Sequence, residues 1–275
     1  MALLLIGAAA GYVGSMTGLG GAVVIMPAMT ILLGVPVEYA VGTSLVATIA
    51  TSSGAAAAYV KDKITNIRIG MSLEVGTTAG AIIGALLAAV VYSHSLSYVI
   101  FITFGVVVLL SLYPTLRHNG SRRAGRPDWT TRLFQLSGSY RDKSTGRLVK
   151  YNGVRWWLGE TVMFIAGILS GLLGIGSGVL KVLAMDSGMH LPIKVSTATS
   201  DFMIGVTAVT GSAVYLALGY INTSYVAPVV VGALFGAMVG ARTMEKTRSS
   251  RIRLLFAVLL VVISVEMILR GLGFA

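Results

Sequence analysis

The chain has 275 residues, of which 55% are hydrophobic and only 11% are charged, and its mean hydropathy is +0.85. This balance excludes an ordinary water-soluble domain and predicts an integral membrane protein. The net charge of +11 could suggest nucleic-acid binding, but the basic residues lie in loops between apolar segments. The positive-inside rule accounts for them there, so we expect no nucleic-acid partner. The absence of Cys excludes disulfides and thiolate sites.

Apolar segments follow one another along the whole chain. Each is close to or longer than the roughly 20 residues that cross a bilayer as a helix. Because lipid-exposed backbone must satisfy its own hydrogen bonds, we expect an all-α polytopic membrane protein. The opening MALLLIGAAAGY lacks the basic stretch of a signal peptide, so we interpret it as part of the mature fold. The apolar segments cover residues 1–33, 40–60, 70–92, 97–114, 157–189, 196–218, 224–243 and 252–272.

An internal repeat relates the two halves of the chain. Residues 11–85 match residues 167–241 without gaps at an offset of 156, with 19 of 75 positions identical, which indicates a duplication. We expect a first transmembrane repeat over residues 1–114, a basic connector over 115–156 and a second repeat over 157–275. The matched pairs include Gly18/Gly174, Gly20/Gly176, Pro36/Pro192, Thr43/Thr199, Ser44/Ser200, Tyr59/Tyr215 and Asn66/Asn222.

The charges in equivalent loops predict that the two repeats have inverted topology. The first repeat carries Lys61, Lys63 and Arg68 after its second apolar segment, whereas the second has no Lys or Arg between 218 and 224 and five between 242 and 253. Inversion requires an odd number of crossings. Each opening segment is therefore expected to form a glycine-broken helical hairpin that enters and returns, followed by three transmembrane helices. This topology places 19 of the 21 Lys and Arg residues on one face, which we assign to the cytoplasm, with both termini outside.

The connector at residues 115–156 is too polar for the bilayer and contains ten of the basic residues. We interpret it as a cytoplasmic link between the repeats that is attracted to anionic membrane lipid. A regulatory or partner-binding role is the alternative interpretation.

The glycine-rich openings MTGLGG (16–21) and LGIGSG (173–178) fit neither the Walker spacing nor the dinucleotide fingerprint. Glycine allows the backbone to leave the helix inside the membrane, which frees N–H groups at the positive end of the next half-helix, where anions bind. Two equivalent breaks favour a binding site between the repeats, and tight packing without a ligand is the alternative. The candidate substrate-binding residues at the breaks are Gly18, Gly20, Gly21, Gly174, Gly176, Ser177 and Gly178.

Two further motifs, GTSL at 42–45 and ATSD at 198–201, open the next helix of each repeat. Their hydroxyl groups either cap these helices or donate hydrogen bonds to an oxyanion. The later glycines are spaced as small-xxx-small ladders that allow close helix packing. The candidate hydroxyl donors are Thr43, Ser44, Thr199 and Ser200, and the ladder glycines are Gly76, Gly80, Gly84, Gly232, Gly236 and Gly240.

Two charged residues lie deep in apolar segments, where a charge usually faces a cavity or a partner. Lys181 and Asp201 have Ile25 and Leu45 as their repeat counterparts, so each charge occurs in one half only. We expect the two to pair when the site is empty, with Lys181 binding substrate and Asp201 serving as the ion-coupling residue. A structural ion pair is the alternative. Glu74 lies one turn into its helix near Lys61, Lys63 and Arg68, so we interpret it as part of an interfacial pair.

Catalytic chemistry has no support in the sequence. The three His residues show no metal-ligand spacing, and no nucleophile lies in a recognisable constellation. We therefore expect no metal, no cofactor and no enzymatic activity.

The ordered, duplicated motifs of the chain resemble the sulfite exporter TauE/SafE family of membrane permeases. The glycine-rich openings are GSMTGLGGAVVIMPAM, followed by GVPVEYAVGTSL, and GLLGIGSGVLKVLAM, followed by HLPIKVSTATSDFMIGVTA. The later motif is GALFGAMVGAR. The resemblance covers nearly the whole chain except the connector. It implies secondary transport, without ATP, of organosulfur anions such as sulfite, sulfoacetate, taurine or aromatic sulfonates. The long basic connector and Asp201 depart from the family pattern. The family's signature positions here are Gly18, Gly20, Thr43, Ser44, Gly174, Gly176, Gly178, Thr199 and Ser200.

The sequence thus predicts a multi-pass cell-membrane protein that moves a small organosulfur anion by alternating access, with proton or sodium coupling. A passive anion channel is the alternative from another class, and a membrane scaffold whose functional part is the connector is a third. A homo-oligomer is compatible with either transport reading.

Overall fold

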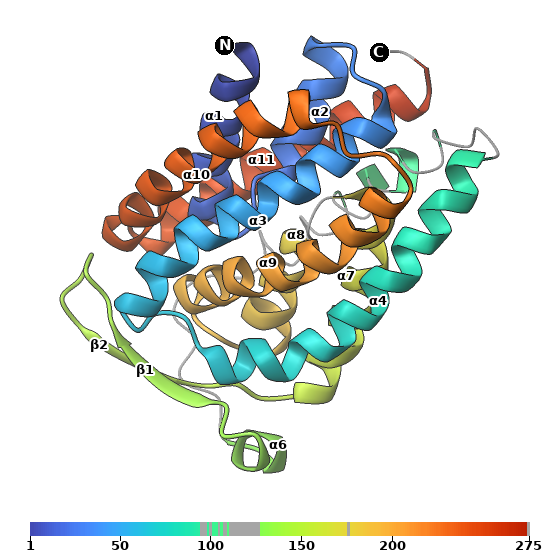
Figure 1. Cartoon of the computed structure of the whole chain (residues 1–275). Coiled ribbons are helices and arrows are strands. Elements are labelled where there is room, and N and C mark those ends of the chain that lie inside the picture. Colours follow the sequence, from blue (N-terminus) through green and yellow to red (C-terminus); the bar gives the residue numbers. More distant parts are fainter. Residues whose placement is uncertain are drawn as a thin grey trace.

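The computed structural model describes residues 1–93, 98, 101–103, 105–106, 109, 127–174 and 177–273 of the chain. It is a bundle of helices with a two-stranded hairpin at one end (Figure 1). The elements are α1 Ala2–Thr17, α2 Ala22–Leu32, α3 Val37–Lys61, α4 Ile67–Ser93, α6 Trp129–Leu133, β1 Ser137–Arg141, β2 Leu148–Asn152, α7 Trp156–Leu173, α8 Gly178–Leu183, the π-helical turn η1 Ala184–Gly188, α9 Ile193–Ala217, α10 Thr223–Lys246 and α11 Ser249–Gly271.

Six helices within the described residues are long and apolar enough to cross a membrane. They are α3, α4, α7, α9, α10 and α11, while α1 and α2 are apolar but shorter. This confirms the predicted all-α polytopic membrane class, to which the small β-hairpin is an exception. The apolar segment predicted at 97–114 lies largely outside the described residues.

Each half of the chain opens with a broken pair of helices, as the glycine patterns predict. Residues 18–21 separate α1 from α2, and residues 174–177 separate α7 from α8. In Figure 1, α1 begins at the end of the molecule that carries the N-terminus, whereas α7 follows the β-hairpin at the other end. The amide of Val154 donates to the carbonyl of Met189 at 3.2 Å, so the second pair also returns to the β-hairpin end.

Helices from different halves pack closely against each other. α1 lies along α10 and α7 lies along α4, which are equivalent pairs under the 156-residue offset. A Cβ added at Gly84 would lie 1.9 Å from the Ile168 carbonyl oxygen, and one at Gly236 would lie 2.0 Å from that of Ala8. Backbone therefore touches backbone, and the predicted glycine ladders are confirmed.

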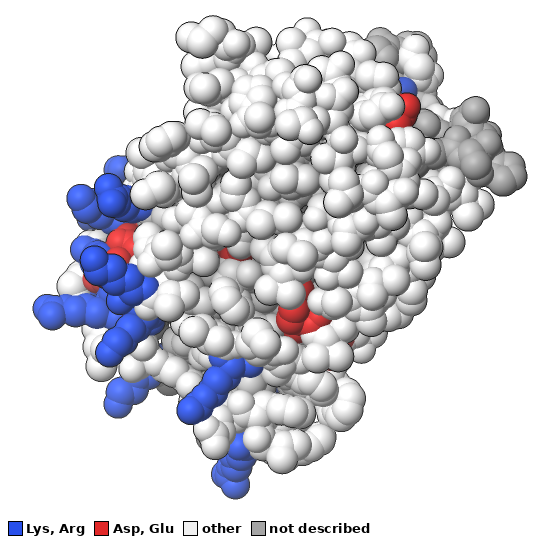
Figure 2. Space-filling model, viewed as in Figure 1, with Lys and Arg blue, Asp and Glu red and all other residues white. Residues whose placement is uncertain are grey.

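Basic side chains gather at the end of the molecule that carries the β-hairpin (Figure 2). We call this the basic end, formed by residues 61–68, 127–155, 194 and 242–251. Among the residues that the structure describes, two basic side chains lie apart from it. Lys181 is buried in the interior, and Arg270, in the last turn of α11, donates to Thr30 and lies 5.1 Å from the centre of the Phe101 ring.

The described part of the connector, residues 127–155, folds onto the helical bundle. β1 and β2 are antiparallel, with Ser137 opposite Asn152. Tyr140 and Tyr151 are buried, and Asn66 Nδ2 donates to the Tyr151 hydroxyl at 3.1 Å. The sequence analysis expected a polar link and missed both strands, because basic and small polar residues occupy their exposed positions and hide the alternating pattern.

Asp128 joins the start and the end of this folded segment. Its Oδ1 accepts from the amide of Thr131 and its Oδ2 from the amide of Arg155, both at 2.7 Å. Burial opposes the charge, but hydrogen bonds from Thr130, Arg155 and Thr131 outweigh it and hold the pKa of Asp128 well below its usual range.

An ion-pair cluster, which we call the hairpin latch, fixes the tip of the hairpin to three helices. Lys143 Nζ lies 2.7 Å from Asp62 Oδ2, just after α3, and 2.8 Å from Glu245 Oε2 in α10. Lys194 Nζ, in α9, lies 2.8 Å from Asp142 Oδ1. Hydrogen bonds to Asp62 and then Glu245 raise the pKa of Lys143. Burial opposes the charge of Asp142, but hydrogen bonds from Lys194 and Ser144 lower its pKa.

Candidate anion-binding site

The helix breaks use backbone conformations that favour glycine. At the first break, Gly18, Gly20 and Gly21 have φ values of 78°, 74° and 77°. At the second break, Gly174 has φ 68° and Ser177 has φ 53°. A left-handed residue ends a helix at no steric cost only when it is glycine, which explains the glycine-rich openings. The predicted site residue Gly176 lies outside the described residues.

The two breaks meet in the interior of the bundle. A Cβ added at Gly178 would lie 2.5 Å from both the carbonyl oxygen of Gly18 and the Cα of Leu19. A Cβ on Gly18 would lie 2.9 Å from the Cα of Thr197 in α9. Two predicted glycines from different halves, Gly18 and Gly178, are thus brought together, and we call this contact the central junction, defined by residues 18–21, 174, 177 and 178.

Two equivalent serines tie the junction together across the halves. Ser44 Oγ, on α3, lies 2.7 Å from the carbonyl oxygen of Gly174 and 2.8 Å from that of Val41. Ser200 Oγ, on α9, donates to the carbonyl oxygen of Gly18 at 2.8 Å. Each hydroxyl satisfies a carbonyl that has lost its helical partner at the end of α7 or α1. In this conformation the two serines therefore hold the hairpins instead of presenting free donors.

The neighbouring threonines differ from each other. Thr199 Oγ1 accepts from the amide of Asn66 at 3.1 Å, so it fixes the loop before α4. Thr43 is its repeat counterpart, but its buried Oγ1 has no hydrogen-bond partner in the described part of the chain.

Several other buried polar groups around the junction are also unsatisfied. Asp201 is fully buried, and neither of its carboxylate oxygens has a hydrogen-bond partner among the described residues. The hydroxyls of Ser177 and Thr197 share this property. Buried polar atoms are almost always hydrogen-bonded, so these groups are candidates for contacts with a substrate, an ion or water.

Lys181 does not pair with Asp201, and this part of the sequence-based prediction is wrong. Its Nζ lies 3.4 Å from Glu74 Oε2 and 2.5 Å from Thr207 Oγ1, and Thr207 Oγ1 lies 2.5 Å from Glu74 Oε1. Thr207 and Asp201 are six residues apart on α9, which places them about 120° apart around the helix. Ser52 of α3 donates to the Asp201 carbonyl, so that part of α9 packs against α3.

Glu74 is the functional candidate that the sequence analysis missed. It is 6% exposed and pairs with Lys181 in the interior, not with the basic residues at the membrane interface. A signal was available, because Lys181 requires an anionic partner and Glu74, like Lys181, has an apolar repeat counterpart, Val230.

Six membrane-spanning candidates, broken helices and buried charges define a polytopic membrane protein with polar groups in its interior. The model of the family described as sulfite exporter TauE/SafE matches residues 3–267, and the chain belongs to this family. It is 32% identical over 277 residues to the probable membrane transporter protein YunE of Bacillus subtilis, covering 98% of this chain and 97% of that one.

Other relatives agree with the assignment. The probable membrane transporter protein YdhB of Bacillus subtilis is 26% identical, over 88% of this chain and 87% of its own. Sulfite exporter TauE/SafE family protein 5 of Arabidopsis thaliana is 41% identical over 61 residues, which are 22% of this chain and 13% of that one. No solved structure matches the chain. The family and these relatives are transporters, in agreement with a multi-pass cell-membrane protein that is not an enzyme.

Proposed function

We propose that the protein is a secondary active transporter of a small organosulfur anion, such as sulfite, sulfoacetate, taurine or another sulfonate, coupled to protons or sodium. The observation that carries the proposal is the central junction. Two broken hairpins meet there, and the hydroxyls of Ser177 in the junction, of Thr197 beside Gly18 and of Thr43 next to Ser44 are unsatisfied among the described residues. Broken helices that meet around buried polar groups suit a site that is reached alternately from either side.

The proposed movement follows from an inverted relation between the repeats. One hairpin enters the membrane from the end that carries the N-terminus, and the other enters from the basic end. The positive-inside rule assigns the basic end to the cytoplasm. Rocking of one repeat against the other would open the junction first to one side and then to the other. The serine bonds to Gly18 and Gly174 would then be exchanged for bonds to the substrate.

Lys181 supplies the positive charge for the anion in this mechanism. Its present partner, Glu74, must be displaced from Lys181 when substrate binds. Asp201, which has no partner of its own in the described residues, is the separate candidate for carrying the coupling ion. In this mechanism the carboxylate that pairs with Lys181 and the carboxylate that carries the coupling ion are two different residues, Glu74 and Asp201.

Uptake into liposomes containing the purified protein tests the proposal. The panel is sulfite, sulfate, taurine, sulfoacetate and an aromatic sulfonate, each with and without a pH or sodium gradient. We expect gradient-driven accumulation of one organosulfur anion, loss of high-affinity binding in Lys181→Met, and retained binding without gradient dependence in Asp201→Asn. Equilibration without accumulation under every gradient would identify a passive channel instead. Wild-type affinity in Lys181→Met would remove that residue from the site.

A further inference from the structure

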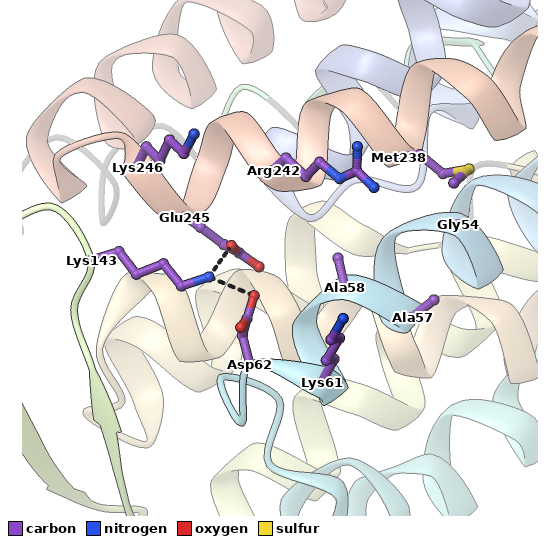
Figure 3. A pocket seen from close by; sticks show the side chains of 10 residues that line it. All are labelled: Gly54, Ala57, Ala58, Lys61, Asp62, Lys143, Met238, Arg242, Glu245 and Lys246. Carbon is purple, nitrogen blue, oxygen red and sulfur yellow. Dashed lines mark hydrogen bonds and ion pairs between the residues drawn. The ribbon is translucent and has the colours of Figure 1, made fainter.

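A polar pocket lies at the basic end, on the outer surface of the bundle and apart from the central junction. Its volume is about 440 Å³, and it is bounded by α3, α10 and the tip of the β-hairpin (Figure 3). Its lining contains both charged and apolar residues, whose order along the helices indicates what it could bind.

The charged half of this pocket has an excess of positive charge. Lys143 bridges the two acids, Asp62 and Glu245, at 2.7 Å and 2.8 Å, as Figure 3 shows. The remaining cations of the pocket are exposed and form no ion pair within 4.0 Å in the described part of the chain. They are Lys61, Arg242 and Lys246.

The other half of the pocket is apolar and lies deeper along the same helices. Gly54, Ala57 and Ala58 line it from α3, and Met238 lines it from α10. Ala57 is exposed and Met238 is 41% exposed, so the groove faces outward from the bundle. Gly54 is seven residues before Lys61, which is a distance of roughly 10 Å along a helix.

This arrangement has the amphipathic order of a phospholipid. Lys61 and Lys246 are the last residues of α3 and α10, where these spans leave the membrane, and the apolar groove runs from there toward the hydrocarbon. Basic pockets of this kind between transmembrane helices bind anionic headgroups. A solvated basic surface without a ligand would explain the three cations. It would not explain the apolar groove that adjoins them.

We propose that the pocket between α3 and α10 binds one anionic phospholipid. Lys61, Arg242 and Lys246 hold its phosphate, and one acyl chain lies over Ala57 and beside Met238. Because α3 belongs to the first half of the chain and α10 to the second, the bound lipid bridges the two halves beside the hairpin latch.

Native mass spectrometry of the detergent-purified full chain tests this site with phosphatidylglycerol and phosphatidylcholine. We expect saturable binding of one phosphatidylglycerol and weaker binding of phosphatidylcholine. The variant Lys61→Gln/Arg242→Gln/Lys246→Gln should lose at least tenfold in affinity for phosphatidylglycerol. Arg132→Gln/Arg147→Gln/Lys150→Gln removes the same charge from exposed positions of the connector and should bind as the wild type does.

A second arm separates a lipid from a free phosphate. Ala57→Phe fills the groove at an exposed position, so it should weaken phosphatidylglycerol binding while its three cations remain in place. Glycerol 3-phosphate should bind far more weakly than phosphatidylglycerol. The proposal is overturned if both triple charge variants lose the same affinity for phosphatidylglycerol. It is also overturned if Ala57→Phe does not change this affinity and glycerol 3-phosphate competes with phosphatidylglycerol at similar concentrations.

Discussion

Ser44 and Ser200 show how a single hydroxyl can join two halves of a protein. Each bonds the carbonyl at which the hairpin of the other half breaks. A carbonyl that loses such a partner in a buried position is left unsatisfied, at a cost of about 1–3 kcal/mol.

We therefore expect Ser44→Ala and Ser200→Ala each to lower the thermal stability of the purified protein and to reduce transport severalfold. Unfolding in detergent and liposome uptake measure the two effects. Ser53→Ala and Ser212→Ala are matched controls on the same two helices, because Ser53 is exposed, Ser212 is half-buried, and each hydroxyl bonds only within its own helix. Equal losses in the controls would show that the cross-half bonds have no special role.

The Lys181–Glu74 pair should behave as a buried ion pair. Removal of one partner leaves an uncompensated charge, which costs about 3–5 kcal/mol, whereas removal of both does not. Lys181→Met and Glu74→Gln should each destabilise the fold strongly, and the double variant should recover much of the loss. A double-mutant cycle on thermal unfolding measures the coupling. Additive losses would mean that the two residues do not interact.

Asp128 gives the connector a defined response to acid. Because its pKa is lowered in the folded state, its ionised form stabilises the fold above the unfolded pKa of about 3.9, and this stabilisation is lost as the pH falls through the lower folded value. Hydrogen exchange over residues 127–155 should not respond to this group between about pH 8 and about pH 5. Asp128→Ala should raise exchange at all of these pH values. A rise in exchange of the wild type near pH 6, absent in Asp128→Ala, would contradict this.

At the scale of elements, the glycine ladders set the distance between paired helices. Gly84→Ala and Gly236→Ala each place a methyl group on a facing backbone carbonyl, and such overpacking costs about 1–3 kcal/mol. We expect a lower melting temperature for both variants. Ala79→Ser, at an exposed position of α4, is the control and should be neutral. Unchanged stability in both glycine variants would show that the helices separate freely.

The sequence predicts correctly those elements that depend on the residues of one segment. Glycine spacing located both helix breaks, and hydropathy located the spanning helices, because each depends on the residues of one segment. The partner of Lys181 could not be found in the same way. Glu74 lies 107 residues away, and the choice between Glu74 and Asp201 depends on which faces of α8 and α9 meet. The β-hairpin was missed for a related reason, since its alternating pattern is weak and its buried Tyr151 is held by Asn66, which is distant in the sequence.

At the scale of the whole molecule, the charge distribution predicts one orientation in the membrane. Thr145, at the tip of the β-hairpin, and Ser224, in the first turn of α10, are both exposed and lie at opposite ends of the bundle. Since the chain has no native Cys, Thr145→Cys and Ser224→Cys can be labelled singly in intact cells. A membrane-impermeant maleimide should label Ser224→Cys directly and Thr145→Cys only after permeabilisation. Labelling of both from outside would refute the topology.

The pairing of α1 with α10 and of α7 with α4 makes each half of the chain incomplete by itself. A fragment ending near residue 114 would lack α10, which packs on the backbone of α1, and α9, whose Ser200 bonds the Gly18 carbonyl. The other fragment would lack α4, which packs on α7, and α3, whose Ser44 bonds the Gly174 carbonyl. Fission of the polypeptide between the repeats should therefore give two segments that are degraded when made separately but assemble when made together. A single copy of the repeat would be stable only if it inserted into the membrane in both orientations and the two forms paired with each other.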